Sequence, residues 1–105
     1  MSETTEITGP LVKMIRQMGI YALRMNSGMV RVKGGFMHLH DKGTADIIVF
    51  FKTGRVVWLE TKDPKGVTQK QRIADQAAFA EKVRDLGHEY YLIKSIDEGL
   101  AALRG

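Results

Sequence analysis

Two short apolar runs dominate the hydrophobic pattern in the middle of the chain. The first spans Ala45 to Phe51 and the second spans Val56 to Glu60, and both are rich in β-branched and aromatic residues. Lys52-Thr53-Gly54 lies between them. Runs of this length and composition around a glycine-containing turn predict a β-hairpin.

The length of the turn decides which residues meet across this hairpin. A three-residue loop with Gly54 in a left-handed bulge places Phe51 opposite Arg55. Counting back along both strands then places Asp46 opposite Glu60. Directly opposed residues face the same side of a sheet, so the two carboxylates are expected to converge. A two-residue loop would put them on opposite faces, and no shared site could form.

The rest of the chain alternates helical and strand patterns. Apolar residues at helical spacing predict a helix from Thr8 to Met18 and another from Thr68 to Leu86, each followed by glycine. The second helix is expected to bury one stripe of residues: Ile73, Ala77, Ala80, Val83 and Leu86. Further strands are predicted over residues 20–25, 29–33, 36–40 and 90–93, and a capping box, Ser95-x-x-Glu98, begins a final short helix.

These elements predict an α/β fold, a mixed sheet flanked by helices in the order α-β-β-β-α-β-α. The long helix is expected to cross right-handed between the second hairpin strand and a parallel strand at 90–93. With 105 residues, the chain is expected to form one domain, residues 1–105.

Composition narrows the class of protein. A hydrophobic content of 44% with 27% charged residues is ordinary for a soluble globular domain, and no apolar run is long enough to cross a bilayer. The sequence contains no cysteine, which excludes disulfides and thiolate metal sites. A net charge of +4 suits a polyanionic partner, although ribosomal and membrane-surface proteins share that balance.

Asp46, Glu60 and Lys62 are the candidates for chemistry. Alternation along a strand puts Glu60 and Lys62 on one face, with Thr61 on the other. Carboxylates at a solvent-open strand end suit Mg²⁺ or Mn²⁺. The plainer interpretation is solvated strand-end charges paired with Lys62 or Arg55.

Histidines offer a second, weaker candidate. His38 and His40 could bind Zn²⁺, but Asp41 is the only further ligand nearby, so a polar strand end or a phosphate contact is favoured.

Asp46, Glu60-x-Lys62 and Thr68-x-x-Gln71 together resemble the PD-(D/E)XK nuclease core. The order G-x-x-D, turn, E-x-K, G-x-(S/T)-x-x-Q, helix, Gly, strand is similar to that of the VRR-NUC branch, in its small stand-alone phage and bacterial form. The resemblance runs from about Glu6 to the last helix and implies a restriction-endonuclease-like core. One departure is Ala45, where the family usually has Pro, and this should affect turn stiffness more than chemistry.

The resemblance also implies roles for individual residues. It assigns catalysis to Asp46, Glu60, Lys62 and Gln71, and a metal to Asp46, Glu60, the Thr61 carbonyl and a first-helix acid, Glu6. Lys62 would orient or deprotonate the attacking water. Gln71 would reach Lys62 or that water, yet a T-x-x-Q capping box explains it equally well. Glu6 would complete the metal shell, unless Gly9-Pro10 leaves it outside the helix and merely solvated.

Basic residues are expected to gather near the proposed site and contact DNA phosphates: Arg24, Arg31, Lys33, Lys42, Lys65, Lys70 and Arg72. The expected function is a Mg²⁺- or Mn²⁺-dependent, structure-specific DNA endonuclease, without a small-molecule cofactor or membrane partner, in the cytoplasm of a bacterial or phage-infected host cell. Resolution of Holliday junctions by a homodimer is the sharpest hypothesis. A flap or nicking nuclease acting as a monomer or in a complex, and an inactive nucleic-acid-binding module, are the alternatives.

The dimer hypothesis rests on apolar residues between the first helix and the hairpin, which read as a protruding arm: Tyr21, Met25, Met29, Val32, Phe36 and Met37. Exposed alone, such an edge would invite aggregation, and pairing with a second copy would cover it. The alternative is that these residues complete the monomer core.

Overall fold

The structure is a computed structural model, and it describes residues 3–25, 29–38, 43–62 and 70–104. The helices and strands follow in chain order: α1 (Glu3–Gln17), β1 (Tyr21–Arg24), β2 (Met29–Val32), β3 (Gly35–His38), β4 (Ile47–Phe50), β5 (Val56–Thr61), α2 (Lys70–Asp85), β6 (Glu89–Ile93) and α3 (Ile96–Leu103). None of the helices in the described ranges is long and apolar enough to cross a membrane.

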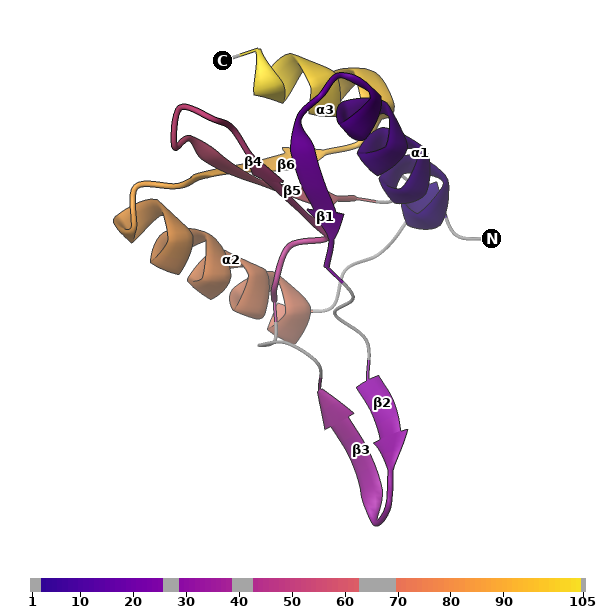
Figure 1. Ribbon diagram of the computed structural model, residues 1–105. Helices are drawn as coiled ribbons and strands as arrows, with labels where there is room; N and C mark the ends of the chain where they lie inside the picture. The colour runs from indigo at the N-terminus through magenta and orange to yellow at the C-terminus, as the bar shows by residue number, and fades with distance from the viewer. Residues whose placement is uncertain (1–2, 26–28, 39–42, 63–69, 105) are drawn as a thin grey trace.

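Four strands form the main sheet, in the order β1-β4-β5-β6. β4 is antiparallel to β1 and β5, whereas β6 runs parallel to β5 after the crossover through α2. The predicted mixed sheet and the order α-β-β-β-α-β-α are therefore confirmed for this body of the protein. β2 and β3 form a separate antiparallel hairpin, and Figure 1 shows it projecting from one end of the molecule.

The β4–β5 register is the one that the turn predicts. Ile47 pairs with Leu59 and Phe50 pairs with Val56. At the turn, Gly54 has a φ of 96° and its N–H donates to the Phe51 carbonyl at 3.0 Å. One step beyond the Ile47–Leu59 pair, Asp46 lies opposite Glu60.

Helices cover both faces of the sheet (Figure 1). On one face, α1 and α3 pack over a core that includes Leu11, Ile15, Val57 and Leu59, all with 0% exposure. On the other face, α2 packs over a smaller cluster of buried and half-buried residues: Ala45, Trp58, Phe79, Ala80, Val83 and Tyr90. Glu60 belongs to this second face by strand alternation, whereas Asp46 directly precedes β4 and Lys62 directly follows β5.

The first helix differs from the prediction in its extent. α1 begins at Glu3 instead of Thr8, so Pro10 lies in its interior. Proline lacks the N–H that an interior position normally donates, which is why a sequence pattern places a helix start close to it. Packing of Leu11 and Ile15 against the sheet holds the helix through this position.

The predicted buried stripe of α2 is partly wrong. Ala80 and Val83 are buried, but Ile73 and Leu86 are 50% and 69% exposed and Ala77 is also exposed. Gln76 is buried instead, at 8% exposure. The buried face of α2 therefore includes Gln76, whose amide donates to Glu60 on the sheet at 2.9 Å, in place of Ile73 and Ala77. The predicted N-cap, Thr68, lies outside the described residues.

Arg55 links the start of β5 to β6 and α3, at the end of the sheet that is remote from Glu60. Its guanidinium pairs with both carboxylate oxygens of Glu89 and donates to the carbonyls of Ala102 and Leu103, at 3.0 and 2.6 Å. Arg55 and the Tyr91 hydroxyl lower the pKa of Glu89 to about 2 by hydrogen bonding to its carboxylate. These contacts show Arg55 engaged with Glu89 and the C-terminus of α3.

The last helix begins as its sequence predicts. The Ser95 hydroxyl accepts a hydrogen bond from the Glu98 N–H at 3.1 Å. The predicted capping box therefore starts α3 at Ile96.

Candidate functional site

Asp46 stands just before β4 and is fixed to β5 through Thr61. Its Oδ2 accepts from the Thr61 N–H at 2.9 Å and from the Thr61 hydroxyl at 2.6 Å. The same hydroxyl lies 3.2 Å from that of Thr8 on α1, on the opposite side of the sheet from α2. These hydrogen bonds fix Asp46, just before β4, against Thr61 at the end of β5. The other carboxylate oxygen, Oδ1, takes part in neither bond.

Glu60 lies across from Asp46 and is almost fully buried, at 2% exposure. Its Oε1 accepts from the Gln76 amide Nε2 at 2.9 Å, while Oε2 is buried without a hydrogen-bond partner among the described residues. Burial and, next, the negative charge of Asp46 together raise the pKa of Glu60 to about 8, against an opposing effect of Arg72. A carboxyl group in this position keeps its proton at neutral pH unless a positive charge lies next to it.

A close backbone contact keeps Gln76 within reach of Glu60. Gly43, in the loop before Asp46, has a φ of 84°, and a Cβ there would lie 2.2 Å from the Asp75 carbonyl oxygen on α2. Only glycine allows both the conformation and the approach. The loop that delivers Asp46 and the helix that delivers Gln76 are therefore packed directly against each other.

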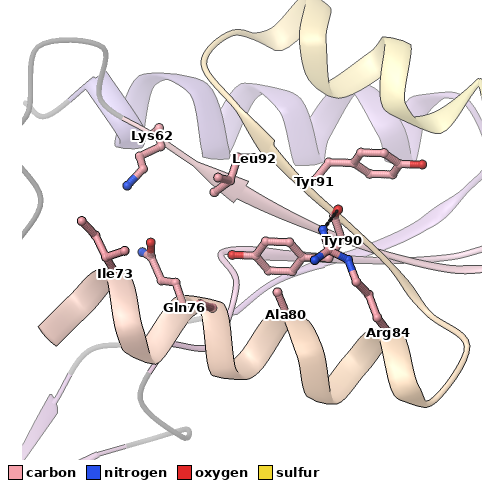
Figure 2. A pocket seen from close by; sticks show the side chains of 9 residues that line it. Lys62, Ile73, Gln76, Ala80, Arg84, Tyr90, Tyr91 and Leu92 are labelled. Carbon is pink, nitrogen blue, oxygen red and sulfur yellow. Dashed lines mark hydrogen bonds between the residues drawn. The ribbon is translucent and has the colours of Figure 1, made fainter. Parts of the chain in front are cut away.

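Lys62 and Tyr90 complete the polar side of the site. The Lys62 N–H donates to the Ile93 carbonyl at 2.8 Å, and its side chain lines a pocket with Gln76 and Tyr90 (Figure 2). The Tyr90 hydroxyl is buried and, like Glu60 Oε2, lacks a hydrogen-bond partner in the described ranges. Burial raises the pKa of Tyr90, as do the charges of Glu60 and Asp46, so the phenol stays protonated and can donate.

The donor set fits a hard divalent cation. Two carboxylates oppose each other, one of them with an unpartnered buried oxygen, and the charge of one raises the pKa of the other. A cation between them would satisfy that oxygen and remove the repulsion. The described side chains contain no group of three or more His, Cys, Asp or Glu residues around one point. Further ligands would have to be backbone or water oxygens or Glu6, whose backbone lies in α1 but whose side chain is outside the described part.

Gln71 occupies a different place from Gln76. Its amide donates to the Asp75 carboxylate at 3.0 Å on the exposed side of α2. A catalytic role for Gln71 stays a prediction from the resemblance. The periodicity of the helix gives no signal for Gln76, because a glutamine between apolar positions resembles an ordinary exposed residue.

The candidate DNA contacts are only partly brought together. Arg24 is exposed and pairs with Ile47, one residue from Asp46, and Arg72 is exposed on the first turn of α2. Lys33 is exposed in the turn between β2 and β3, at the tip of the projecting hairpin (Figure 1), and its contact with DNA stays a prediction. The remaining candidates have side chains outside the described part: Arg31, Lys42, Lys65 and Lys70, and also His38, His40 and Asp41.

Comparison with solved structures gives a similar fold. A solved structure described as "VRR_NUC domain" aligns with a TM-score of 0.65 at 12% sequence identity, over 99% of this chain and 97% of that chain. Neither a scan of protein-family models nor a search of curated proteins finds a match. The expected fold is therefore confirmed over the length of the chain.

Proposed function

We propose that this protein is a metal-dependent, structure-specific DNA endonuclease. The observation that carries the proposal is the opposition of Asp46 and buried Glu60 beside Lys62, with Glu60 Oε2 unpartnered in the described part of the chain. The likeness to a fold described as "VRR_NUC domain" supports a nuclease. Fold alone does not assign activity, so the side chains of this site carry the argument.

The residues have distinct tasks in phosphodiester hydrolysis. Asp46 and Glu60 would hold Mg²⁺ or Mn²⁺, with the Thr61 carbonyl and Glu6 as further candidate ligands. When bound, the cation lowers the pKa of an attacking water and offsets charge on the phosphate. Lys62 places an ammonium on the same face as Glu60, where it orients the water or stabilises the charge that develops on the phosphate. Gln76 holds Glu60 with Oε2 turned away from the amide.

The substrate is expected to be DNA recognised by shape. Arg24 and Arg72 are exposed close to the carboxylates, where they can contact phosphates without reading bases. Branched DNA, including Holliday junctions, is the substrate class that the resemblance favours.

A homodimer would suit a junction, since a two-fold axis sets two sites against two strands. The projecting β2–β3 hairpin carries Val32, which is 40% exposed. Tyr21 is 58% exposed and stacks on Phe50 at 5.8 Å between ring centroids. Both residues lie outside the monomer core, but Tyr21 lies at the far end of β1 from the hairpin, so Val32 is the exposed apolar residue that supports pairing through the hairpin.

Labelled four-way, flap and linear DNA, incubated with Mg²⁺ or Mn²⁺ and then with EDTA, tests the proposal. Cleavage that EDTA stops and that Asp46→Asn abolishes is the expected result. Light scattering gives the assembly: a mass near 11.8 kDa opposes the dimer, and about twice that mass supports it. Paired symmetric nicks in the junction favour a resolvase, and flap cutting by a monomer favours the alternative. DNA binding without cleavage in either metal contradicts the enzyme.

A further inference from the structure

A pocket of about 440 Å³ opens between α2 and β6, next to the carboxylates. Its polar lining includes Lys62, Gln76, Arg84 and Tyr90, and its apolar lining includes Ile73, Ala77 and Leu92. Figure 2 shows Ile73 and Gln76 on α2 facing Lys62, Tyr90 and Leu92 on the side of the strands. The volume lies in the range of roughly 300–1,000 Å³ that small-molecule sites occupy.

The apolar wall of this pocket is unusually open. Ile73 is 50% exposed and Leu92 is 54% exposed, on two elements that face each other. Leu92 pairs in register with Glu60, so the wall begins beside the carboxylate. The pocket is therefore a continuation of the proposed active site, with an apolar surface directly next to a cationic side chain.

Tyr90 is a second sign that something is bound here. Its hydroxyl is buried and has no hydrogen-bond partner among the residues described. Buried polar groups almost always have a partner, and an exception calls for a ligand, an ion or a water. Tyr90 lines the pocket, but its hydroxyl is closed off from solvent in the unliganded protein, so a small movement of the lining side chains must uncover it before it donates to an oxygen of a bound group.

The charges around the pocket favour an anionic ligand. Lys62 lies at the end next to the carboxylates, and the Arg84 guanidinium lies 5.5 Å from the centroid of the Tyr90 ring. A phosphate alone would use the cations but leave the apolar wall exposed. A sugar and an unstacked base use that wall, as in proteins that bind single-stranded nucleic acid on apolar and aromatic side chains.

We propose that this pocket binds one unstacked nucleotide of the substrate strand, beside the phosphate that is cleaved. The base and sugar lie against Ile73, Ala77 and Leu92, and the phosphate faces Lys62 and the Tyr90 hydroxyl. The position beside a cleaved phosphate rests on the proposed nuclease function, whereas nucleotide binding itself does not. A nucleotide that must leave the stack is available at a branch or a frayed end and is expensive to extract from intact duplex. This gives a structural reason for a preference for branched DNA.

A titration with thymidine 5′-monophosphate in EDTA tests the pocket without any cleavage. Methyl NMR signals of Ile73 and Leu92 are expected to shift together and to saturate. Thymidine alone should shift them less, and inorganic phosphate alone should leave them in place. Signals that stay fixed, or that shift no more with the nucleotide than with inorganic phosphate, overturn the proposal.

Two exposed apolar residues provide a matched pair. Ile73→Ser changes a residue on α2 and Leu86→Ser changes the residue directly after its end, but only Ile73 lines the pocket. Ile73→Ser is expected to weaken nucleotide binding and to lower kcat/KM on branched DNA, each by roughly fivefold or more, as loss of an apolar contact would. Leu86→Ser should change neither. Equal effects from the two variants would contradict the assignment.

Tyr90→Phe separates binding from folding. It removes a buried hydroxyl without a described partner, so the melting temperature should stay the same or rise. The affinity for the nucleotide should fall roughly tenfold, the scale of a hydrogen bond to a charged group. Tyr91 also lines the pocket, but its hydroxyl donates to Glu89 at 2.7 Å, so Tyr91→Phe is the structural control and should lower the melting temperature without weakening nucleotide binding. If Tyr90→Phe lowers the melting temperature but leaves nucleotide binding unchanged, the hydroxyl is only structural. That result would refute its proposed role in binding.

The two proposals fail in different ways. Nucleotide binding in the pocket without cleavage of any DNA refutes the nuclease and leaves the pocket assignment standing. Cleavage of branched DNA that Ile73→Ser and Tyr90→Phe do not alter, without nucleotide binding, refutes the pocket and leaves the nuclease standing.

Discussion

Ionisation of Glu60 should make the metal-free protein less stable as pH rises. Its carboxyl group is 2% exposed and faces Asp46, and its pKa is raised from 4.5 to about 8. In the unfolded chain the group ionises near its ordinary pKa, so between the two values the folded state binds a proton that the unfolded state lacks. The free energy of unfolding therefore decreases with rising pH over this window and levels off above about 8.

The size of this loss of stability follows from the pKa shift of Glu60. A difference of about 3.5 units corresponds to a loss of about 5 kcal/mol once Glu60 is fully ionised, at 1.36 kcal/mol per unit. The same relation gives about 3 kcal/mol at pH 7 and under about 1 kcal/mol at pH 5. Glu60→Gln keeps an acceptor for Gln76 and cannot ionise. It should therefore be nearly neutral at pH 5 and stabilising by several kcal/mol at about pH 8.5.

Urea unfolding of the wild type and of Glu60→Gln, in EDTA at these two pH values, measures the difference between their free energies of unfolding. Glu81→Gln, an exposed change on α2, is the control and should shift stability equally at both. Mn²⁺ should narrow the gap at high pH for the wild type and leave Glu60→Gln unaffected, because a cation stabilises only the ionised carboxylate. A pH-independent effect of Glu60→Gln would refute the assignment of an uncompensated buried acid.

The remaining predictions concern residues around Glu60. Gln76→Leu should weaken Mn²⁺ binding, measured by calorimetry, and reduce cleavage by about tenfold to a hundredfold, because Glu60 loses its positioning donor. Gln71→Ala should change cleavage by less than about twofold if Gln71 serves only α2, whereas a loss of about a hundredfold would restore its catalytic role. Gly43→Ala should destabilise the fold by about 2–4 kcal/mol in urea unfolding, since its Cβ meets backbone. Arg55→Met should lower stability by about 2–3 kcal/mol without changing metal affinity, because this guanidinium lies at the remote end of the sheet.

Local rules were enough to predict the hairpin and the opposition of its two carboxylates. The Gly54 turn has few conformations, and strand alternation then leaves only one face for each side chain. Those two constraints place Asp46 opposite Glu60, and the structure has the register that they require. The capping box at Ser95 is similarly local, and it is also confirmed.

Features that depend on contacts between distant elements could not be predicted in this way. The start of α1 depends on packing that holds the helix through Pro10. The rotation of α2 depends on a hydrogen bond between Gln76 and Glu60, sixteen positions apart in the sequence. The burial of Glu60 itself requires α2 to lie over it, and a sequence pattern gives no measure of that.

The departure of α2 from its expected phase connects the site to the pocket. A helix turned to bury all its apolar residues would bring Ile73 and Ala77 inward and would take Gln76 away from the sheet. The observed phase instead leaves Ile73 50% exposed, yet gives Glu60 a donor and opens an apolar wall beside Lys62. The exposure of Ile73 and the burial of Gln76 both reduce the apolar area that α2 buries, and both fit the proposed cation and nucleotide sites. Burial predicted from sequence tends to fail at functional sites. Here the two exceptions, exposed Ile73 and buried Gln76, lie one turn apart on α2.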